Sequence, residues 1–190
     1  IQVSGIRGSL VKSMDVKRSS IGVVDAISAE DIGKFPDTNL AESLQRITGV
    51  AIDRSNGEGS RVTVRGFGPE FNLVMLNGRQ MPASSLEATT ASSSRSFDFA
   101  NLASEGIAGV EVYKTGRASI ATGGMGSTIN ILTTKPLNAP GMKATFGVKG
   151  VMDQSTDEGS NITPELSGLY SNTFNDDKFG VAISGSYQKR

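Results

Sequence analysis

The pattern of apolar and polar positions changes near Met142. Before that residue, short apolar stretches alternate with glycine- and serine-rich segments, which predicts short helices and strands joined by turns. After it, apolar and polar residues alternate with a period of two over stretches of about ten residues, as in long β-strands. The sequence therefore predicts two parts of different architecture.

The strongest helical signal covers residues 38–48. Its apolar residues recur at helical spacing and share one face: Leu40, Leu44 and Ile47. Asp37 is the expected N-cap and Gly49 the expected C-terminal stop. This apolar stripe has to be buried against other elements, and the strands that follow are the candidates.

Short strands are expected to begin near Val23 and to cover residues 50–53, 61–65, 73–76, 110–113 and 129–133. The Asn77-Gly78 pair is the strongest short-range signal for a hairpin. A short helix is expected over 29–34 and a turn over 101–105, while the serine-rich segment 83–96 is expected to be an exposed loop. Glycines and serines interrupt residues 1–20, which are expected to form an extended or mobile arm.

The second part contains three alternating stretches, at 144–152, 165–173 and 179–190. A polar stretch at 153–163 separates the first two, and a tight polar turn at 175–178 separates the last two. Each stretch has one apolar face and one face of small and polar residues, which is typical of outer-membrane barrel strands. On alternation alone, an antiparallel meander of a soluble protein is an equal alternative.

The composition excludes several classes of function. The 190 residues contain 19 Lys+Arg and 19 Asp+Glu, and the sequence has no basic stripe, so it gives no argument for nucleic-acid binding. The chain has no Cys and no His. Disulfides, thiolate metal sites and catalysis by Ser–His–Asp or Cys–His groups are therefore excluded within it. We expect no enzyme activity, no metal site and no cofactor.

The remaining chemical motifs are weak. The glycine cluster 123–126 lacks the spacing of phosphate-binding loops. Three acidic residues at 153, 157 and 158 lack EF-hand spacing, so a solvated loop is the simpler interpretation. Glycoside hydrolysis needs two carboxylates in one cleft. The chain contains the candidates Asp98, Glu105 and Glu111, but nothing in the sequence places two of them together.

Several ordered segments resemble the plug domain of TonB-dependent outer-membrane receptors. They are residues 40–50, with the expected helix and the following strand, then 61–67, 73–79, 110–114 and 123–131. The resemblance implies an α+β plug domain with a mixed sheet, followed by antiparallel strands of a transmembrane β-barrel of roughly 22 strands. It divides the chain into an N-terminal arm (1–20), a plug (21–136) and the first three barrel strands (137–190). Three strands do not close a barrel, so this chain is expected to be part of a longer transporter.

The family resemblance also implies partners and contact residues. The N-terminal segment is similar to the TonB box, through which the periplasmic energy transducer TonB binds by edge pairing: Ile1, Gln2, Val3, Ser4 and Gly5. Loops at the outer end of the plug are expected to contact the ligand through Arg79, Gln80 and Arg95. Arg65 and Lys114 are expected to pair with acidic residues of the inner barrel wall. Many family members have Arg-Gly-Pro where this chain has Lys114-Thr115-Gly116, so a contact made by that Arg passes to Lys114.

The implied function is active import of an extracellular nutrient across the bacterial outer membrane, with the plug facing the periplasm and the barrel in lipid. Segments 35–40 and 97–114 resemble a branch of the family common in bacteria that degrade polysaccharides, so an oligosaccharide is the expected ligand. A ferric siderophore is the alternative ligand, and a binding or adhesion module without transport is the alternative function.

Overall fold

The computed structural model describes residues 6–28, 39–55, 58–83, 94–102, 106–152 and 162–188. The chain forms two compact units, Ile1–Thr133 and Thr134–Arg190. The expected helix at 29–34, the expected cap Asp37 and the TonB-box-like residues 1–5 lie outside the described residues. In the part that is described, no helix is long and apolar enough to span a membrane.

The first unit is built on a five-stranded mixed sheet with strand order β1-β6-β7-β4-β5. These strands are β1 (Val24–Ser28), β4 (Asn72–Leu76), β5 (Arg79–Gln80), β6 (Ile107–Tyr113) and β7 (Ser127–Thr133). The β4–β7 pair is parallel, and the other pairs are antiparallel. This sheet confirms the expected mixed-sheet α+β fold.

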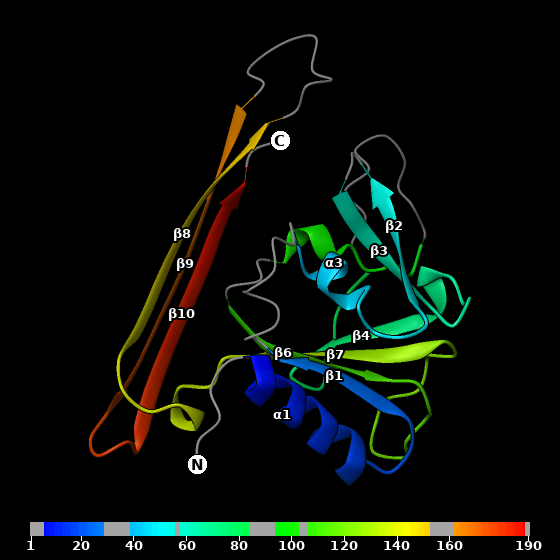
Figure 1. Cartoon of the computed structure of the whole chain (residues 1–190), viewed down its shortest axis with the longest axis horizontal. Coiled ribbons are helices and arrows are strands. Elements are labelled where there is room, and N and C mark those ends of the chain that lie inside the picture. The colour runs from blue at the N-terminus through cyan, green and yellow to red at the C-terminus, as the bar shows by residue number, and fades with distance from the viewer. Residues whose placement is uncertain are drawn as a thin grey trace. The chain divides into compact units, whose positions relative to one another are not determined.

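A separate hairpin of β2 (Val50–Ser55) and β3 (Glu58–Val64) packs with helix α3 (Leu40–Leu44). Figure 1 shows this hairpin and α3 on one side of the five-stranded sheet and helix α1 (Ile6–Ser19) on the other side, beside β1. Short 3-10 turns, η1 (Pro69–Phe71) and η2 (Phe99–Asn101), connect these elements. The apolar core therefore lies between the sheet and the α3–hairpin layer, with contributions from Leu40, Val62, Val110 and Ile129.

The predicted apolar stripe of the helix is confirmed, but its predicted bounds are wrong. Leu40 and Leu44 are fully buried and Ile47 is nearly so. The N-cap is Asn39, whose side chain accepts a hydrogen bond from the Glu42 amide. The α-helix ends at Leu44, because the next residues make i→i+3 bonds such as that from the Ile47 amide to the Leu44 carbonyl.

Residues 6–19 are not an extended arm as predicted but helix α1. Its side toward the sheet consists of small residues and one valine, with Ser9 buried and Gly8, Ser13 and Val16 half-buried. Small residues let the helix approach β1 closely. The larger apolar residues Leu10, Val11 and Met14 are about half exposed. Contact with the sheet therefore stabilises the helix, although its sequence lacks a conventional apolar face.

The second unit is a three-stranded antiparallel sheet of order β10-β9-β8, preceded by the turn η4 (Pro136–Asn138). The strands are β8 (Lys143–Met152), β9 (Ile162–Phe174) and β10 (Phe179–Gln188). The predicted alternating stretches are confirmed as strands and are one to three residues longer at some ends. The predicted polar turn is also confirmed, with Asn175, Asp176 and Asp177 all at positive φ.

Candidate functional site

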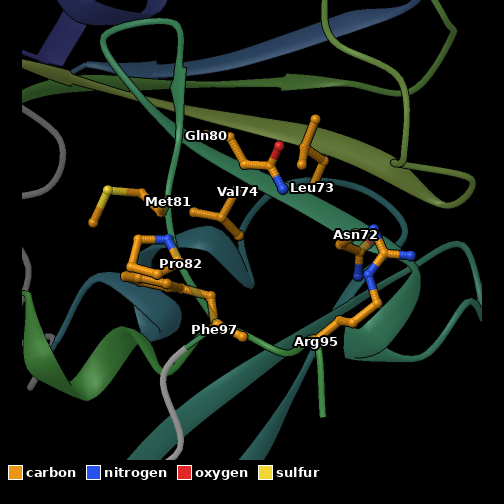
Figure 2. A pocket seen from close by; sticks show the side chains of 9 residues that line it. Asn72, Leu73, Val74, Gln80, Met81, Pro82, Arg95 and Phe97 are labelled. Atoms are coloured by element: carbon orange, nitrogen blue, oxygen red, sulfur yellow. The ribbon is translucent and has the colours of Figure 1, made fainter. Parts of the chain in front are cut away.

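A pocket of about 210 Å3 lies at the β5 edge of the first unit (Figure 2). The hairpin from β4 to β5 forms one wall, and the segment around Phe97 forms another. Its lining residues are Asn72, Leu73, Val74, Gln80, Met81, Pro82, Ala83, Arg95 and Phe97. The pocket therefore joins two parts of the chain that the sequence analysis treated as a hairpin and an exposed loop.

The hairpin that carries β5 is tied firmly to β7. Asn77 and Gly78 both have positive φ, as the predicted Asn-Gly turn requires. The Asn77 side chain donates to Thr133 Oγ1 at 2.8 Å and accepts from the Thr133 amide at 3.0 Å. The Gly78 amide donates to Asn130 Oδ1 at 2.9 Å. These bonds fix the position of β5 without any contribution from its exposed side chains.

The back of the pocket is supported by a buried amide. Asn72 Nδ2 donates to the Val62 carbonyl at 2.9 Å, and Asn72 Oδ1 accepts from Ser127 Oγ at 2.9 Å. The side chain thus joins β3, β4 and β7. Gly126 is needed beside it, because a Cβ at that position would lie 2.7 Å from Asn72 Oδ1 and 2.7 Å from Phe67 Cβ. Since the amide is used in this way, Asn72 positions the pocket and is not free to bind a ligand.

Two of the three predicted ligand residues line this pocket. Gln80 and Arg95 lie on different walls, whereas Arg79 is exposed on β5 and is not among the lining residues. The role of all three in binding stays a prediction. The sequence analysis missed Met81 and Phe97, which line the pocket beside them. The hairpin signal places Met81 just after β5, beside Gln80. No local pattern in the sequence indicates that Phe97 lines the same pocket as Met81.

Arg65 and Lys114, the predicted plug–barrel contacts, both have partners inside the first unit. Arg65 has a φ of 53°, and its Nη2 donates to the Gly126 carbonyl at 2.8 Å. Lys114 is 8% exposed and donates to Asp25 Oδ2 at 2.5 Å and to the Thr48 carbonyl at 2.6 Å. These partners give each residue a role within the unit. Contact with a surrounding wall stays a prediction for both.

Asp25 is the centre of a small charge cluster. Its second oxygen accepts from Lys17 Nζ at 2.8 Å, so one carboxylate on β1 joins α1 to the Lys114 end of β6. Burial alone would raise the pKa of Asp25, but the hydrogen bonds and charges of Lys114 and Lys17 outweigh it and hold the pKa below its usual value. Asp25 therefore stays ionised at neutral pH.

A second polar group lies on β6. Tyr113 Oη donates to Glu111 Oε2 at 2.6 Å, and the guanidinium of Arg117 lies 5.2 Å from the ring centre of Tyr113. Burial and the bond to Glu111 raise the pKa of Tyr113 to about 12. Among the residues that the structure describes, no group of three or more His, Cys, Asp or Glu is placed to hold a metal ion.

The sheet of the second unit has one apolar and one polar face. Cross-strand pairs such as Val148–Leu166 and Ile183–Tyr170 place apolar side chains on the same face. These side chains are largely exposed, for example 75% for Phe146 and 67% for Ile183. On the other face Lys149 Nζ and Glu165 Oε2 lie 3.5 Å apart. An exposed apolar face of this kind is typical of a surface that contacts another protein or a membrane.

The chain combines an α+β domain, built on a mixed sheet, with an antiparallel sheet that has one exposed apolar face. This combination is the one expected for an outer-membrane receptor with a plug domain. Residues 16–128 match the TonB-dependent Receptor Plug Domain family, and the chain belongs to that family.

Two similar proteins of known sequence are named as receptors. The chain is 29% identical over 124 residues to the ferric enterobactin receptor PirA of Pseudomonas aeruginosa, covering 60% of this chain and 16% of the receptor. It is 27% identical over 130 residues to the probable TonB-dependent siderophore receptor PirA of Acinetobacter baumannii, covering 64% of this chain and 17% of that protein. The chain therefore spans about a sixth of the length of the relatives it matches.

Solved structures share the fold at low sequence identity. The alcaligin outer-membrane receptor FauA of Bordetella pertussis has a TM-score of 0.58 and 17% identity, covering 90% of this chain and 27% of FauA. The hemophore receptor HasR of Serratia marcescens, in complex with HasA and heme, has a TM-score of 0.57 and 18% identity over 85% of this chain and 26% of HasR. The copper transporter OprC has a TM-score of 0.56 and 16% identity over 80% of this chain and 22% of OprC.

Proposed function

We propose that this chain forms the N-terminal arm, the plug and the first strands of a TonB-dependent outer-membrane receptor that imports a metal chelate of the siderophore type. The observation that carries the proposal is the plug fold over residues 16–128, joined directly to strands with an exposed apolar face. The division into arm (1–20), plug (21–136) and barrel strands (137–190) belongs to the proposal, and the arm then includes helix α1, which packs on β1.

The apolar face of β8–β10 supports a place in the outer membrane. Exposed side chains such as Phe146, Val148 and Ile183 would face lipid, while the opposite face, with Lys149 and Glu165, would face the barrel lumen. Aromatic residues near the strand ends, Phe174, Phe179 and Tyr187, suit the membrane interface. In this proposal the N-terminal arm faces the periplasm.

Transport is proposed to follow ligand binding at the outer face. Binding makes the arm Ile1, Gln2, Val3, Ser4 and Gly5 available to TonB, which pairs with it as an added strand. TonB then pulls on the chain, and the plug moves enough for the chelate to pass. The protein moves a molecule in this cycle and changes no bond in it.

The ligand class differs from the one that the sequence analysis favoured. The five similar proteins described above do not support the oligosaccharide expectation, because their names refer to ferric enterobactin, siderophore, alcaligin, heme and copper. The alternative, a ferric siderophore, fits this set better.

The proposal is tested with the full-length receptor in a strain that lacks its own siderophore receptors. Cells are grown under iron limitation with a panel of ferric siderophores, and uptake of radioactive iron is measured. At least one chelate should support uptake, and removal of residues 1–5 should abolish it while leaving binding of that chelate to whole cells unchanged. Uptake that survives the deletion would contradict the assignment of the TonB-binding arm. Uptake of an oligosaccharide instead of any chelate would contradict the ligand class.

A further inference from the structure

The segment that connects β7 to β8 is fastened to the second unit before it becomes a strand. Residues 134–142 contain the turn η4, which is closed by a hydrogen bond from the Ala139 amide to the Pro136 carbonyl at 3.1 Å. The turn contacts both β9 and β10. Figure 1 shows it as a short olive coil at the lower end of β10. The connecting segment is therefore held on the sheet over two strands.

One attachment is a contact between η4 and the backbone of β10. A Cβ at Gly180 would lie 2.6 Å from Pro136 Cβ and 3.4 Å from Leu137 Cδ2, so the proline ring rests directly on the strand. A glycine is needed here, because a methyl group would push the ring away. Gly180 pairs with Thr173 of β9, which makes the second attachment.

The second attachment is the hydroxyl group of Thr173. Its Oγ1 accepts a hydrogen bond from the Gly141 amide at 2.8 Å and donates one to Asp177 Oδ1 at 2.5 Å. One hydroxyl thus joins the connecting segment, β9 and the turn that precedes β10. The first ladder pair of β8 is Lys143 with Ser171. Gly141 therefore lies beside the end of β9 that β8 does not cover.

Both attachments are on the polar face of the sheet. Along their strands, Gly180 and Thr173 alternate with Phe179 and Phe174, which belong to the exposed apolar face. The connecting segment therefore reaches β8 from the face that the proposed function assigns to the barrel lumen.

The two attachments change how a pull on the first unit reaches the sheet. Among the described residues β8 pairs only with β9, so a pull on its first residue, Lys143, would open the ladder one pair at a time. With the attachments in place, the load passes into β10 at Pro136 and into β9 at Gly141. Both contacts have to break before β8 is loaded. Prolines at 136 and 140 further restrict rotation in the segment.

We propose that residues 134–142 form an anchor that holds the C-terminal end of the plug on the barrel strands while TonB pulls on the N-terminal arm. The anchor carries the load in β9 and β10 and keeps the first ladder pairs of β8 closed. This inference rests on the proposed import function and adds the element that keeps the receptor assembled under traction.

The test is single-molecule pulling on the full-length receptor in a tethered lipid nanodisc, with the handle at residue 1. At constant force the anchor should open after the plug has extended, and its opening should add about 30 Å of chain, at about 3.5 Å per residue. Gly180→Ala should shorten the lifetime of the anchor by about 5- to 100-fold, the range for overpacking. Thr173→Val should shorten it by about 2- to 10-fold, the range for one lost hydrogen bond.

The controls are Gly185→Ala, on the same strand as Gly180 and with open space around it, and Thr145→Val, on the polar face of β8. Both should leave the lifetime unchanged. The inference is overturned if Gly180→Ala and Thr173→Val open no faster than the wild type, or if the controls open as fast as these variants. It is also overturned if both variants lower only the amount of receptor in the membrane, since that result indicates an ordinary cap of the sheet.

Iron uptake separates the anchor from the transport function. TonB-dependent uptake together with unchanged anchor lifetimes removes the anchor alone. Shortened lifetimes in Gly180→Ala and Thr173→Val, without uptake of any chelate, support the attachments but remove the transport function and with it their role under traction.

Discussion

Replacement of Asp25 by Asn should loosen the link between β1, α1 and the end of β6. The substitution keeps the shape of the side chain but removes the charge that pairs with Lys114 and Lys17. Lys114 is 8% exposed, so its ammonium would keep the Thr48 carbonyl but lose its counter-charge in a poorly hydrated site. Lys17 is 60% exposed and would regain water at little cost.

The magnitude follows from this difference in burial. Loss of one partner from a fully buried ion pair costs about 3–5 kcal/mol, and loss of an exposed pair costs at most about 1 kcal/mol. Because Asp25 is 18% exposed, its pair with Lys114 lies between these limits. We expect Asp25→Asn to lower the free energy of local opening by about 2–3 kcal/mol, which is about a 30- to 150-fold increase in the opening equilibrium.

Hydrogen exchange of the full-length receptor, followed by mass spectrometry, measures this opening. Peptides from β1 and β6 should lose protection by the stated factor at neutral pH. The contribution of Asp25 to the free energy of local opening depends on pH, because the pKa of Asp25 is lowered in the folded protein. It is fully present above the ordinary carboxyl pKa of about 4 and is lost as the pH falls through the lower folded value. The wild type should therefore approach the Asp25→Asn variant only in strong acid.

The matched control is Asp15→Asn, which removes an exposed carboxylate from α1. It should change protection of β1 and β6 by less than about twofold. The reasoning is refuted if Asp25→Asn leaves protection within that range at neutral pH, or if the two variants behave alike.

Three further changes test other parts of the structure. Gly126→Ala should destabilise the plug, because a methyl group there would overlap the Asn72 side-chain amide, which joins β3, β4 and β7. Gly116 has open space around it, so Gly116→Ala should leave the stability unchanged. Thermal melting of the full-length receptor compares the two variants. Leu44→Ala should cost about 2–5 kcal/mol as a fully buried truncation, measured by exchange of α3 and the β2–β3 hairpin. Ile183→Lys on the apolar face of β10 should lower the stability of the receptor in the membrane by about 2–4 kcal/mol and reduce its amount in the outer membrane. Ser184→Lys, on the other face, should leave that amount unchanged. Immunoblots of membrane fractions measure the difference.

Local sequence patterns were sufficient for elements whose signals are also local. The alternation through β8–β10 predicted both the strands and their apolar face, and Asn77-Gly78 predicted the β4–β5 hairpin. The periodicity of Leu40, Leu44 and Ile47 predicted a buried face. It did not predict where the α-helix ends, because the choice between i→i+4 and i→i+3 bonds near Gln45 depends on how the chain enters β2.

Helix α1 could not be predicted because its sequence inverts the usual pattern. An amphipathic helix is recognised by large apolar residues on the buried face. In α1 the small residues around Ser9 are buried and Leu10 and Met14 are half exposed. Glycine and serine in residues 1–20 therefore indicate breaks in regular structure, although the same residues allow the helix to lie close to β1.

The position of Lys114 shows why the roles of charged residues are harder to predict than strands. A cationic side chain at a strand end can be solvated, contact another molecule, or bond to groups of its own domain. Sequence spacing does not distinguish these three cases. The partners of Lys114 are Asp25 and Thr48, which are 89 and 66 residues away in sequence. Only the antiparallel pairing of β1 with β6 brings Asp25 beside it. Because the ammonium is a compact donor, it can bond a carboxylate and a main-chain carbonyl at once in a narrow space. Lys114 therefore has two partners within the plug, and its contact with an acidic residue of a barrel wall stays a prediction.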